Sequence, residues 1–276
     1  MTPHRTASKL LAWIILVTGL AALSGAQQQP STTPLYYDTF TEHWLDPAKW
    51  EAIGPFCAQG LTLECVREIQ NGHLRLSLRN RGDSDSDSGE QFSSDELLFT
   101  NPNAIQSVTA DATVRQLQLV ACPTTTNGQP TRTVEKISGS FFNTGSGDPA
   151  DDASEFLYFY ADASNPGAVT VGNWFCAGSN GPCYGNDFAT YAVGTPLTGT
   201  NTWDKANHQF ISTVKAKWEG GPGKRAILPY SVSDTTPPVN PQRALEVTVA
   251  ASNCTSTRTF AHAETLYDNV IVNAAP

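Results

Sequence analysis

The feature that most restricts the fold of this 276-residue chain is a hydrophobic period of two residues. Segment 73–79 reads HLRLSLR, so Leu74, Leu76 and Leu78 share one face. Successive side chains of a β-strand point to opposite faces, whereas an amphipathic helix has a period of 3.6 residues. This segment is therefore predicted to form a half-buried β-strand.

Similar segments follow one another along the chain. In segment 108–120 the alternation changes parity near Arg115, which predicts a β-bulge there. About a dozen strands are predicted, separated by loops rich in Gly, Pro, Asn, Asp and Ser. No amphipathic window longer than about ten residues remains between these loops. Many strands without helical crossovers predict an all-β sandwich of antiparallel sheets.

The charge balance excludes some classes of partner. The chain has 17 Lys and Arg against 26 Asp and Glu, a net charge of −9. Nucleic acids and anionic membrane surfaces need a concentrated basic face, so neither is the expected main partner.

Segments 83–90 and 148–155 carry four acids each. The first resembles a calcium loop only faintly, because Ser94 stands where an EF-hand has Glu, so a solvated flexible loop is favoured.

The N-terminus has the pattern of a signal peptide. Arg5 and Lys9 precede an apolar run at 10–23, and Ser24-Gly25-Ala26 supplies small residues for cleavage. The run is shorter than the ~20 residues of a membrane span, although an uncleaved anchor is the alternative.

The predicted organisation follows from this signal. We expect a secreted or periplasmic protein with no membrane insertion after cleavage. It would comprise the signal peptide (1–26), a flexible lead (27–34) and one β domain (35–276).

The six cysteines agree with export to an oxidising compartment. Six cysteines allow 15 pairings. Closeness in sequence suggests two pairs and leaves a third that closes a long loop: Cys57–Cys65, Cys176–Cys183 and Cys122–Cys254. A metal site is the weaker alternative, since the sequence has no C-x-x-C motif.

Short motifs at both ends resemble one known superfamily. The N-terminal motifs are YDTF at 37–40, LDPAKW at 45–50 and NGHLRL at 71–76, and the C-terminal motif is LYDNVIV at 266–272. Their order resembles the concanavalin A-like lectin/glucanase superfamily, which includes laminarinase-like glycoside hydrolases and non-catalytic modules. The resemblance implies a jelly-roll sandwich of two antiparallel sheets, with the first and last strands side by side.

The acid motif of the catalytic relatives is broken in this chain. Laminarinase-like families place their acids on one strand, as Glu-x-Asp-x-x-Glu or Glu-x-Asp-x-Glu, and residues two apart on a strand share a face. In the nearest segment, 155–162, Glu155 shares its face with Leu157 and Phe159. No catalytic residue is therefore predicted, although a pair assembled in space, such as Glu155 with Asp187, stays open.

One stretch combines aromatic, amide and carboxylate groups of the kind that bind sugars. Segment 172–187 lies around the predicted Cys176–Cys183 disulfide, and two tyrosines of a neighbouring strand could adjoin it. A loop clipped by a disulfide is preorganised, which lowers the entropic cost of binding. The alternative is that Trp174 simply covers the sheet. The candidate ligand-binding residues are Trp174, Tyr184, Asn173, Asn186, Asp187, Tyr158 and Tyr160.

The resemblance also implies a structural calcium ion where the first and last strands meet. Carried over by motif position, the ligands would be Asp268, the carbonyl of Gly72 and nearby Asp38. Oxygen donors suit Ca²⁺, which extracellular modules bind weakly. The alternative is that Asp268 caps a bend.

These observations predict an exported, non-catalytic carbohydrate-binding domain whose partner is an extracellular glycan. Two alternatives remain open. One is a glycoside hydrolase or polysaccharide lyase with displaced acidic residues, and the other is a structural or adhesive surface protein.

Overall fold

The computed structural model describes residues 35–51, 62–123 and 130–273. The predicted signal peptide, the predicted lead at 27–34 and Cys57 lie outside these residues. In these ranges no helix is long and apolar enough to cross a membrane.

One sheet has eight strands, which pair in the order β13-β12-β11-β6-β15-β4-β3, with β1 also paired to β15. All pairs are antiparallel. The bounds are β1 (Leu35–Asp38), β3 (Thr62–Gln70), β4 (His73–Arg81), β6 (Ser107–Val120), β11 (Leu197–Asp204), β12 (Gln209–Ala216), β13 (Lys224–Pro229) and β15 (Phe260–Val272).

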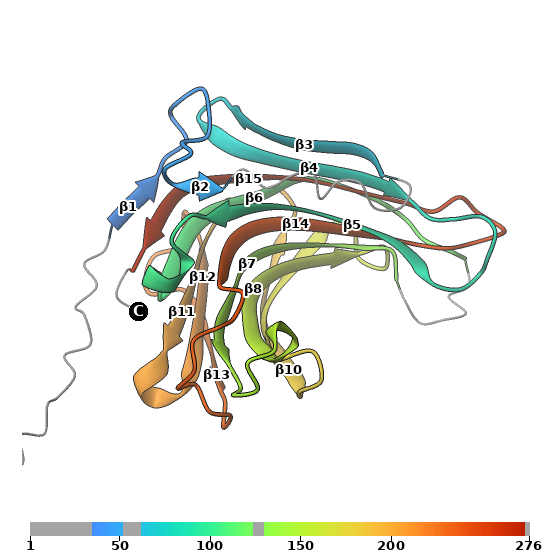
Figure 1. Ribbon diagram of the computed structural model, residues 1–276. Coiled ribbons are helices and arrows are strands. Elements are labelled where there is room, and N and C mark those ends of the chain that lie inside the picture. Colours follow the sequence, from blue (N-terminus) through green and yellow to red (C-terminus); the bar gives the residue numbers. More distant parts are fainter. Residues whose placement is uncertain (1–34, 52–61, 124–129, 274–276) are drawn as a thin grey trace, which may run out of the picture. The chain divides into compact units, whose positions relative to one another are not determined.

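The other sheet has seven strands in the order β10-β9-β8-β7-β14-β5-β2, again all antiparallel. The bounds are β2 (Trp50–Glu51), β5 (Glu90–Phe99), β7 (Arg132–Asn143), β8 (Asp152–Asp162), β9 (Ala168–Ala177), β10 (Cys183–Ala192) and β14 (Gln242–Ser252). Figure 1 shows β4, β15 and β6 in one layer beside β14 and β5 of the other.

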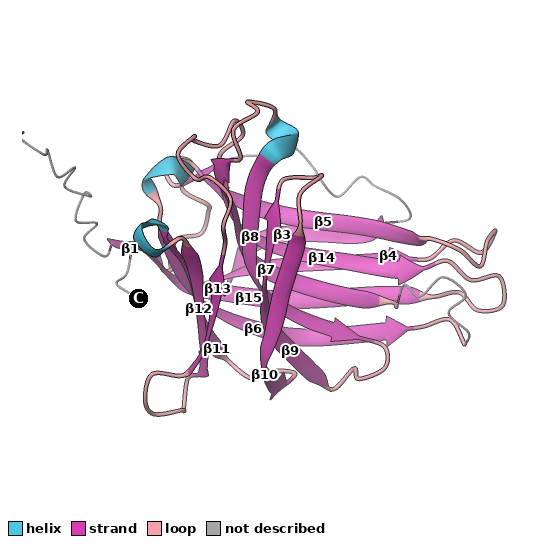
Figure 2. Cartoon of the chain, turned by 90° about the horizontal axis from the view of Figure 1, so that it is seen from below, coloured by secondary structure: helices cyan, strands magenta, loops and turns pink. Residues whose placement is uncertain are grey.

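Helical structure in the described ranges is limited to single turns in the connections (Figure 2). These are the 3₁₀ helices η2 (Pro102–Ala104), η3 (Pro149–Asp151) and η4 (Lys205–Asn207). The fold is thus an all-β jelly-roll sandwich of two antiparallel sheets, as the sequence predicts. The β1–β15 pairing also brings the first and last strands together.

The two-residue period has the expected consequence for burial. Leu74, Leu76 and Leu78 of β4 are fully buried between the sheets. The predicted bulge lies at Arg115, because Glu264 pairs with Gln116 while the next residue of β15 pairs with Val114. On the N-terminal side of Arg115, the apolar residues of β6 therefore face the core.

The sequence predicts a structural role for both Trp44 and Trp50, because a Trp at the apolar edge of a sandwich is usually part of the core. The two residues differ in burial. Trp50 is 2% exposed and packs against Phe40 and Phe99. Trp44 is 67% exposed. The structural interpretation is wrong for Trp44, because the bend before Asp46 directs it to solvent.

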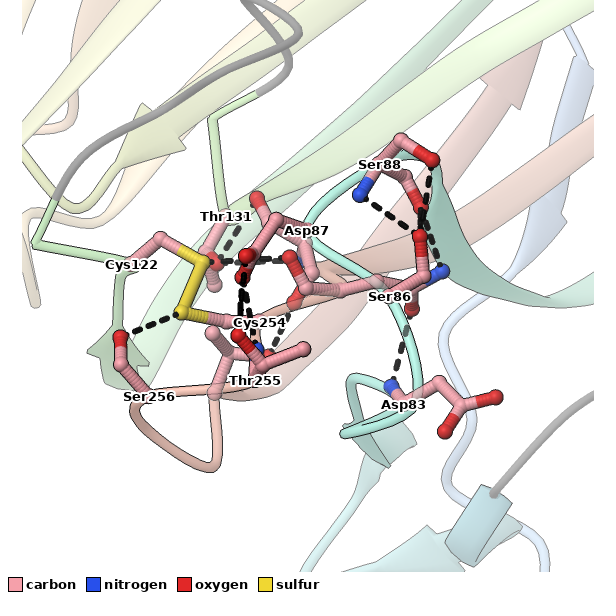
Figure 3. The surroundings of a disulfide bond; sticks show 12 residues. Asp83, Ser86, Asp87, Ser88, Cys122, Thr131, Cys254, Thr255 and Ser256 are labelled. Atoms are coloured by element: carbon pink, nitrogen blue, oxygen red, sulfur yellow. Dashed lines mark hydrogen bonds between the residues drawn. A yellow bond between two sulfur atoms is a disulfide. The ribbon is translucent and has the colours of Figure 1, made fainter.

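Two of the predicted disulfides lie within the described residues. Cys176–Cys183 joins directly paired residues of β9 and β10, and Cys122–Cys254 closes a loop with a sequence separation of 132. Cys65 is also disulfide-bonded. Figure 3 shows the surroundings of Cys122–Cys254.

The acidic segment 83–90 lies beside this disulfide and is more constrained than a free loop. Asp87 accepts hydrogen bonds from the backbone N and the Oγ1 of Thr255, each at 2.8 Å (Figure 3). These bonds lower the pKa of Asp87. Asp87 therefore ties this segment to the neighbouring loop at Thr255, while its own side chain stays exposed.

Candidate functional site

The open face of the seven-stranded sheet, the face that points away from the other sheet, carries a row of aromatic side chains. In β8, Leu157 and Phe159 are fully buried in the core. Phe156, Tyr158 and Tyr160 alternate with them and are partly exposed on the open face. The period of two thus places three rings in line along one strand.

These rings form the floor of a pocket of about 770 Å³, which we call the aromatic pocket. The rest of its lining comes from β7 on one side of β8, from β9 and then β10 on the other side, and from Pro130 just before β7. Trp174 is 37% exposed, so part of its ring is available to a ligand. The lining residues are Pro130, Arg132, Val134, Phe156, Tyr158, Tyr160, Trp174 and Asp187.

Hydrogen bonds fix the polar groups of this pocket. The Tyr158 hydroxyl donates to Asp187 Oδ1, and the Tyr160 hydroxyl donates to Asp162 Oδ2 at 3.0 Å. Burial, followed by the neighbouring carboxylate, raises the pKa of Tyr158, and the pKa of Tyr160 rises to about 12. Both hydroxyls are therefore neutral at physiological pH.

Glycine at position 172 makes room for the Tyr158 ring. Gly172 pairs with Tyr158 across β8 and β9, and a Cβ at Gly172 would collide with the Tyr158 ring carbon Cζ and hydroxyl. A side chain here would displace Tyr158 from the pocket floor.

Four of the seven residues predicted to bind a ligand line the aromatic pocket, and three do not. The predicted loop is instead a hairpin of β9 and β10, so its side chains alternate between two faces. Tyr184 packs against buried Phe175 and donates to the Pro229 carbonyl at 2.9 Å. Asn173 is fully buried, and Asn186, its register partner, is exposed outside the pocket. The four in the pocket are Trp174, Asp187, Tyr158 and Tyr160.

The sequence reasoning missed other residues of the pocket. Phe156 has the parity of Tyr158, so the alternation alone could have indicated it. Arg132 and Val134 could not be found this way, because their position depends on β7 pairing with β8. Arg132 is paired with Glu90, with 2.9 Å between Nη2 and Oε1.

A second, polar cavity of about 250 Å³ adjoins the aromatic pocket, since Phe156 lines both. Glu96 of β5 and Glu246 of β14 are direct register partners and line this cavity together. Glu246 Oε1 accepts from Lys136 Nζ at 2.7 Å and from Thr248 Oγ1 at 2.8 Å. Burial, and then the charge of Glu246, raises the pKa of Glu96 to about 7. Two carboxyl groups therefore face one cavity, and burial raises the pKa of one of them, Glu96.

Glu155 also lines the polar cavity, but its carboxylate lies between the two sheets, away from the aromatic floor. It is fully buried, and its carboxylate accepts from Asn201 Nδ2. Burial raises its pKa to about 8. The suggested pair of Glu155 with Asp187 does not form, because the Asp187 carboxylate meets Tyr158 on the open face.

The predicted calcium ligands have protein partners. Asp38 accepts from the Phe40 backbone N at 2.8 Å and from Trp50 Nε1 at 2.7 Å. Asp268 accepts from the Asn269 backbone N at 2.7 Å. Within the described ranges, no group of three or more His, Cys, Asp and Glu residues could hold a metal ion. The calcium site, which also invokes the Gly72 carbonyl, stays a prediction.

No family model and no curated protein matches the chain. Solved structures that are similar include the winged bean acidic lectin complexed with methyl-alpha-D-galactose, with 10% identity over 86% of this chain and 98% of the lectin, and a TM-score of 0.38. A beta-1,3-glucanase from Mycobacterium marinum has 11% identity over 89% of this chain and 99% of its own, and a TM-score of 0.40. A glycosyl hydrolase family protein from Mycobacterium fortuitum has 12% identity over 88% and 98%, and a TM-score of 0.40.

Proposed function

We propose that this protein binds a glycan on the open face of its seven-stranded sheet. The aromatic pocket is the observation that carries the proposal. Sugar rings present C–H faces that stack on aromatic rings, and ligand pockets of about 300–1,000 Å³ are lined mainly by such side chains with a few polar groups. Phe156, Tyr158, Tyr160 and Trp174 supply the rings, and Asp187 supplies a carboxylate.

We further propose that the glycan is extracellular. Disulfides persist mainly in oxidising compartments, and the described residues contain Cys122–Cys254 and Cys176–Cys183. Export through the signal peptide at 1–26 would bring the protein to such a compartment.

Replacing Trp174 by alanine is expected to weaken glycan binding at least about tenfold, the effect of losing about 1.4 kcal/mol of binding free energy. A glycan array identifies a ligand, and calorimetric titration then measures its Kd. Trp218→Ala is the matched control, because Trp218 is 68% exposed and lies outside the pocket. If no glycan binds, or if both variants bind like the wild type, the open face is not a glycan site.

The Glu96–Glu246 pair favours a second candidate function, hydrolysis of the bound glycan. Directly opposed residues on one face of an antiparallel pair have Cβ atoms about 4.5–5.5 Å apart. Retaining glycosidases need carboxyl groups about 5 Å apart, one to protonate the leaving oxygen and one to attack the sugar. Glu96, with its raised pKa, would be the acid, and Glu246, held by Lys136 and Thr248, would be the carboxylate.

Under this second candidate, Glu96→Gln is expected to abolish release of reducing ends from the bound glycan while leaving its Kd within about threefold of the wild-type value. Wild-type activity should fall as the pH rises above about 7, because Glu96 then loses its proton. Glu51→Gln, at an exposed site, is the control. If a glycan binds to the protein but no reducing ends are released, the hydrolysis candidate is wrong.

A further inference from the structure

A third pocket, of about 310 Å³, shares no lining residue with the aromatic pocket. It lies where η2 and η4 meet the segment between β13 and β14. Phe141, Trp203 and two prolines, Pro237 and Pro238, form apolar parts of its wall. Its charged lining residues are Arg243, Lys205 and Asp234. We call it the cationic pocket, because its cations outnumber its single acid.

Arg243 is an unusual buried cation. Its side chain is 3% exposed, and its guanidinium carbon lies 3.7 Å from the centre of the Phe141 ring. Nε donates to the Ile105 carbonyl at 3.1 Å, and Nη1 donates to the carbonyls of Ser140 and Gln242. All of these acceptors are neutral.

No acid in the described part of the chain forms an ion pair with Arg243. Glu155 influences it electrostatically, but burial raises the pKa of Glu155, which weakens this carboxyl as a counter-ion for Arg243. A buried charge without a counter-ion is unfavourable, and burial accordingly lowers the pKa of Arg243 to about 9. An anion in the pocket would relieve this cost.

Lys205 adds a second cation at the rim. Its Nζ lies 5.3 Å from the centre of the Trp203 ring, and none of the ion pairs formed by the described residues includes it. Asp234, the one acid of the pocket, already has hydrogen-bond partners in the protein. Its Oδ2 accepts from the Tyr230 hydroxyl at 2.7 Å and from His208 Nδ1 at 3.1 Å.

The segment that covers the pocket is held in place. Asp152 accepts from the backbone N of Val239 at 2.8 Å and of Asn240 at 2.7 Å. The Asn143 backbone N donates to the Thr236 carbonyl at 2.9 Å. A pocket fixed by its own hydrogen bonds loses little conformational freedom when a ligand binds.

We propose that the cationic pocket binds a small organic carboxylate, such as a sugar acid. The Arg243 guanidinium and the Lys205 ammonium would pair with the carboxylate, because charge-assisted hydrogen bonds from a guanidinium suit its geometry. Trp203 and the two prolines would contact the carbon skeleton. Asp234 in the same wall disfavours a dianion such as phosphate by repulsion. This site is independent of the glycan proposal, since the two pockets share no residue.

The test follows the indole N–H resonances of the full protein by NMR during titration with D-glucuronate. We expect saturable shifts for Trp203 and none for Trp174. D-glucose, which lacks the carboxylate, should leave Trp203 unchanged, and inorganic phosphate should bind more weakly than glucuronate. Lys205→Glu should weaken glucuronate binding at least about tenfold.

Lys224→Glu is the matched control, because Lys224 is also exposed and its Nζ lies 5.5 Å from the centre of the Tyr191 ring, outside this pocket. It should bind glucuronate like the wild type. The proposal is overturned if glucuronate gives no saturable shift at Trp203, if glucose or phosphate binds as tightly, or if both lysine variants weaken binding equally.

Discussion

Replacing Glu135 by glutamine is expected to flatten the pH dependence of folding stability between pH 5 and 8. Glu135 has no exposed surface, and the nearby hydroxyls of Thr133 and Thr265 offset only part of the cost of burying its charge. Burial raises its pKa from 4.5 to about 8. The folded state therefore keeps this proton over a range in which the unfolded chain releases it.

The sign of the effect follows from this difference in proton binding. Stability falls with pH wherever the folded state binds more protons, by about 1.4 kcal/mol per pH unit for one group. The full contribution is present below pH 4.5 and is lost as the pH rises toward 8, about 3 kcal/mol of it by pH 7. The wild type should be most stable near pH 5, and Glu155 acts with the same sign.

Urea unfolding at several pH values measures this effect. Glu135→Gln should reduce the slope of unfolding free energy against pH by up to about 1.4 kcal/mol per pH unit and leave the part that is due to Glu155 and Glu96. Glu51→Gln, at an exposed site, should leave the slope unchanged. Equal slopes for the wild type and Glu135→Gln would show that this carboxyl is ionised in the fold.

Replacing Trp50 by alanine is expected to lower the free energy of unfolding by about 3–5 kcal/mol, the usual cost of deleting a buried aromatic side chain. The Trp50 ring lies 4.5 Å from that of Phe99 and 5.7 Å from that of Phe40, measured between centres. Its Nε1 donates to Asp38 Oδ2 at 2.7 Å. The variant would therefore leave a cavity and remove the hydrogen bond to Asp38 Oδ2, which would keep only the ion pair with Lys49 Nζ at 3.8 Å.

Thermal unfolding should show a fall in Tm of about 10 °C for Trp50→Ala, since 1 kcal/mol corresponds to about 2–4 °C in a domain of this size. Trp44→Ala is the matched control, because Trp44 lies six residues earlier and is mostly exposed. Similar Tm values for the two variants would mean that Trp50 does not close this edge of the sandwich.

The local pattern was sufficient for much of the fold. The alternation around Leu76 predicts a strand with one buried face, and the parity change predicts the bulge at Arg115. Both are local properties, because the pleat of a strand alone decides which neighbours share a face. Closeness in sequence likewise led to the Cys176–Cys183 pair.

The candidate site depended on information that is not local. The alternation says that Tyr158 and Tyr160 share a face, but not that the second sheet covers the opposite one. The alternation assigns Trp174 and Tyr184 to different environments only once the register of the β9–β10 hairpin is known.

Glu96 and Glu246 show most clearly what the local sequence pattern cannot predict, since 150 residues separate them in the sequence. They meet because β14 inserts between β5 and β7. The sequence by itself determined the strands and the faces of each strand. Only the tertiary structure decided which strands are neighbours, because pairing is set by the burial of all the strands together and not by the pattern of any one.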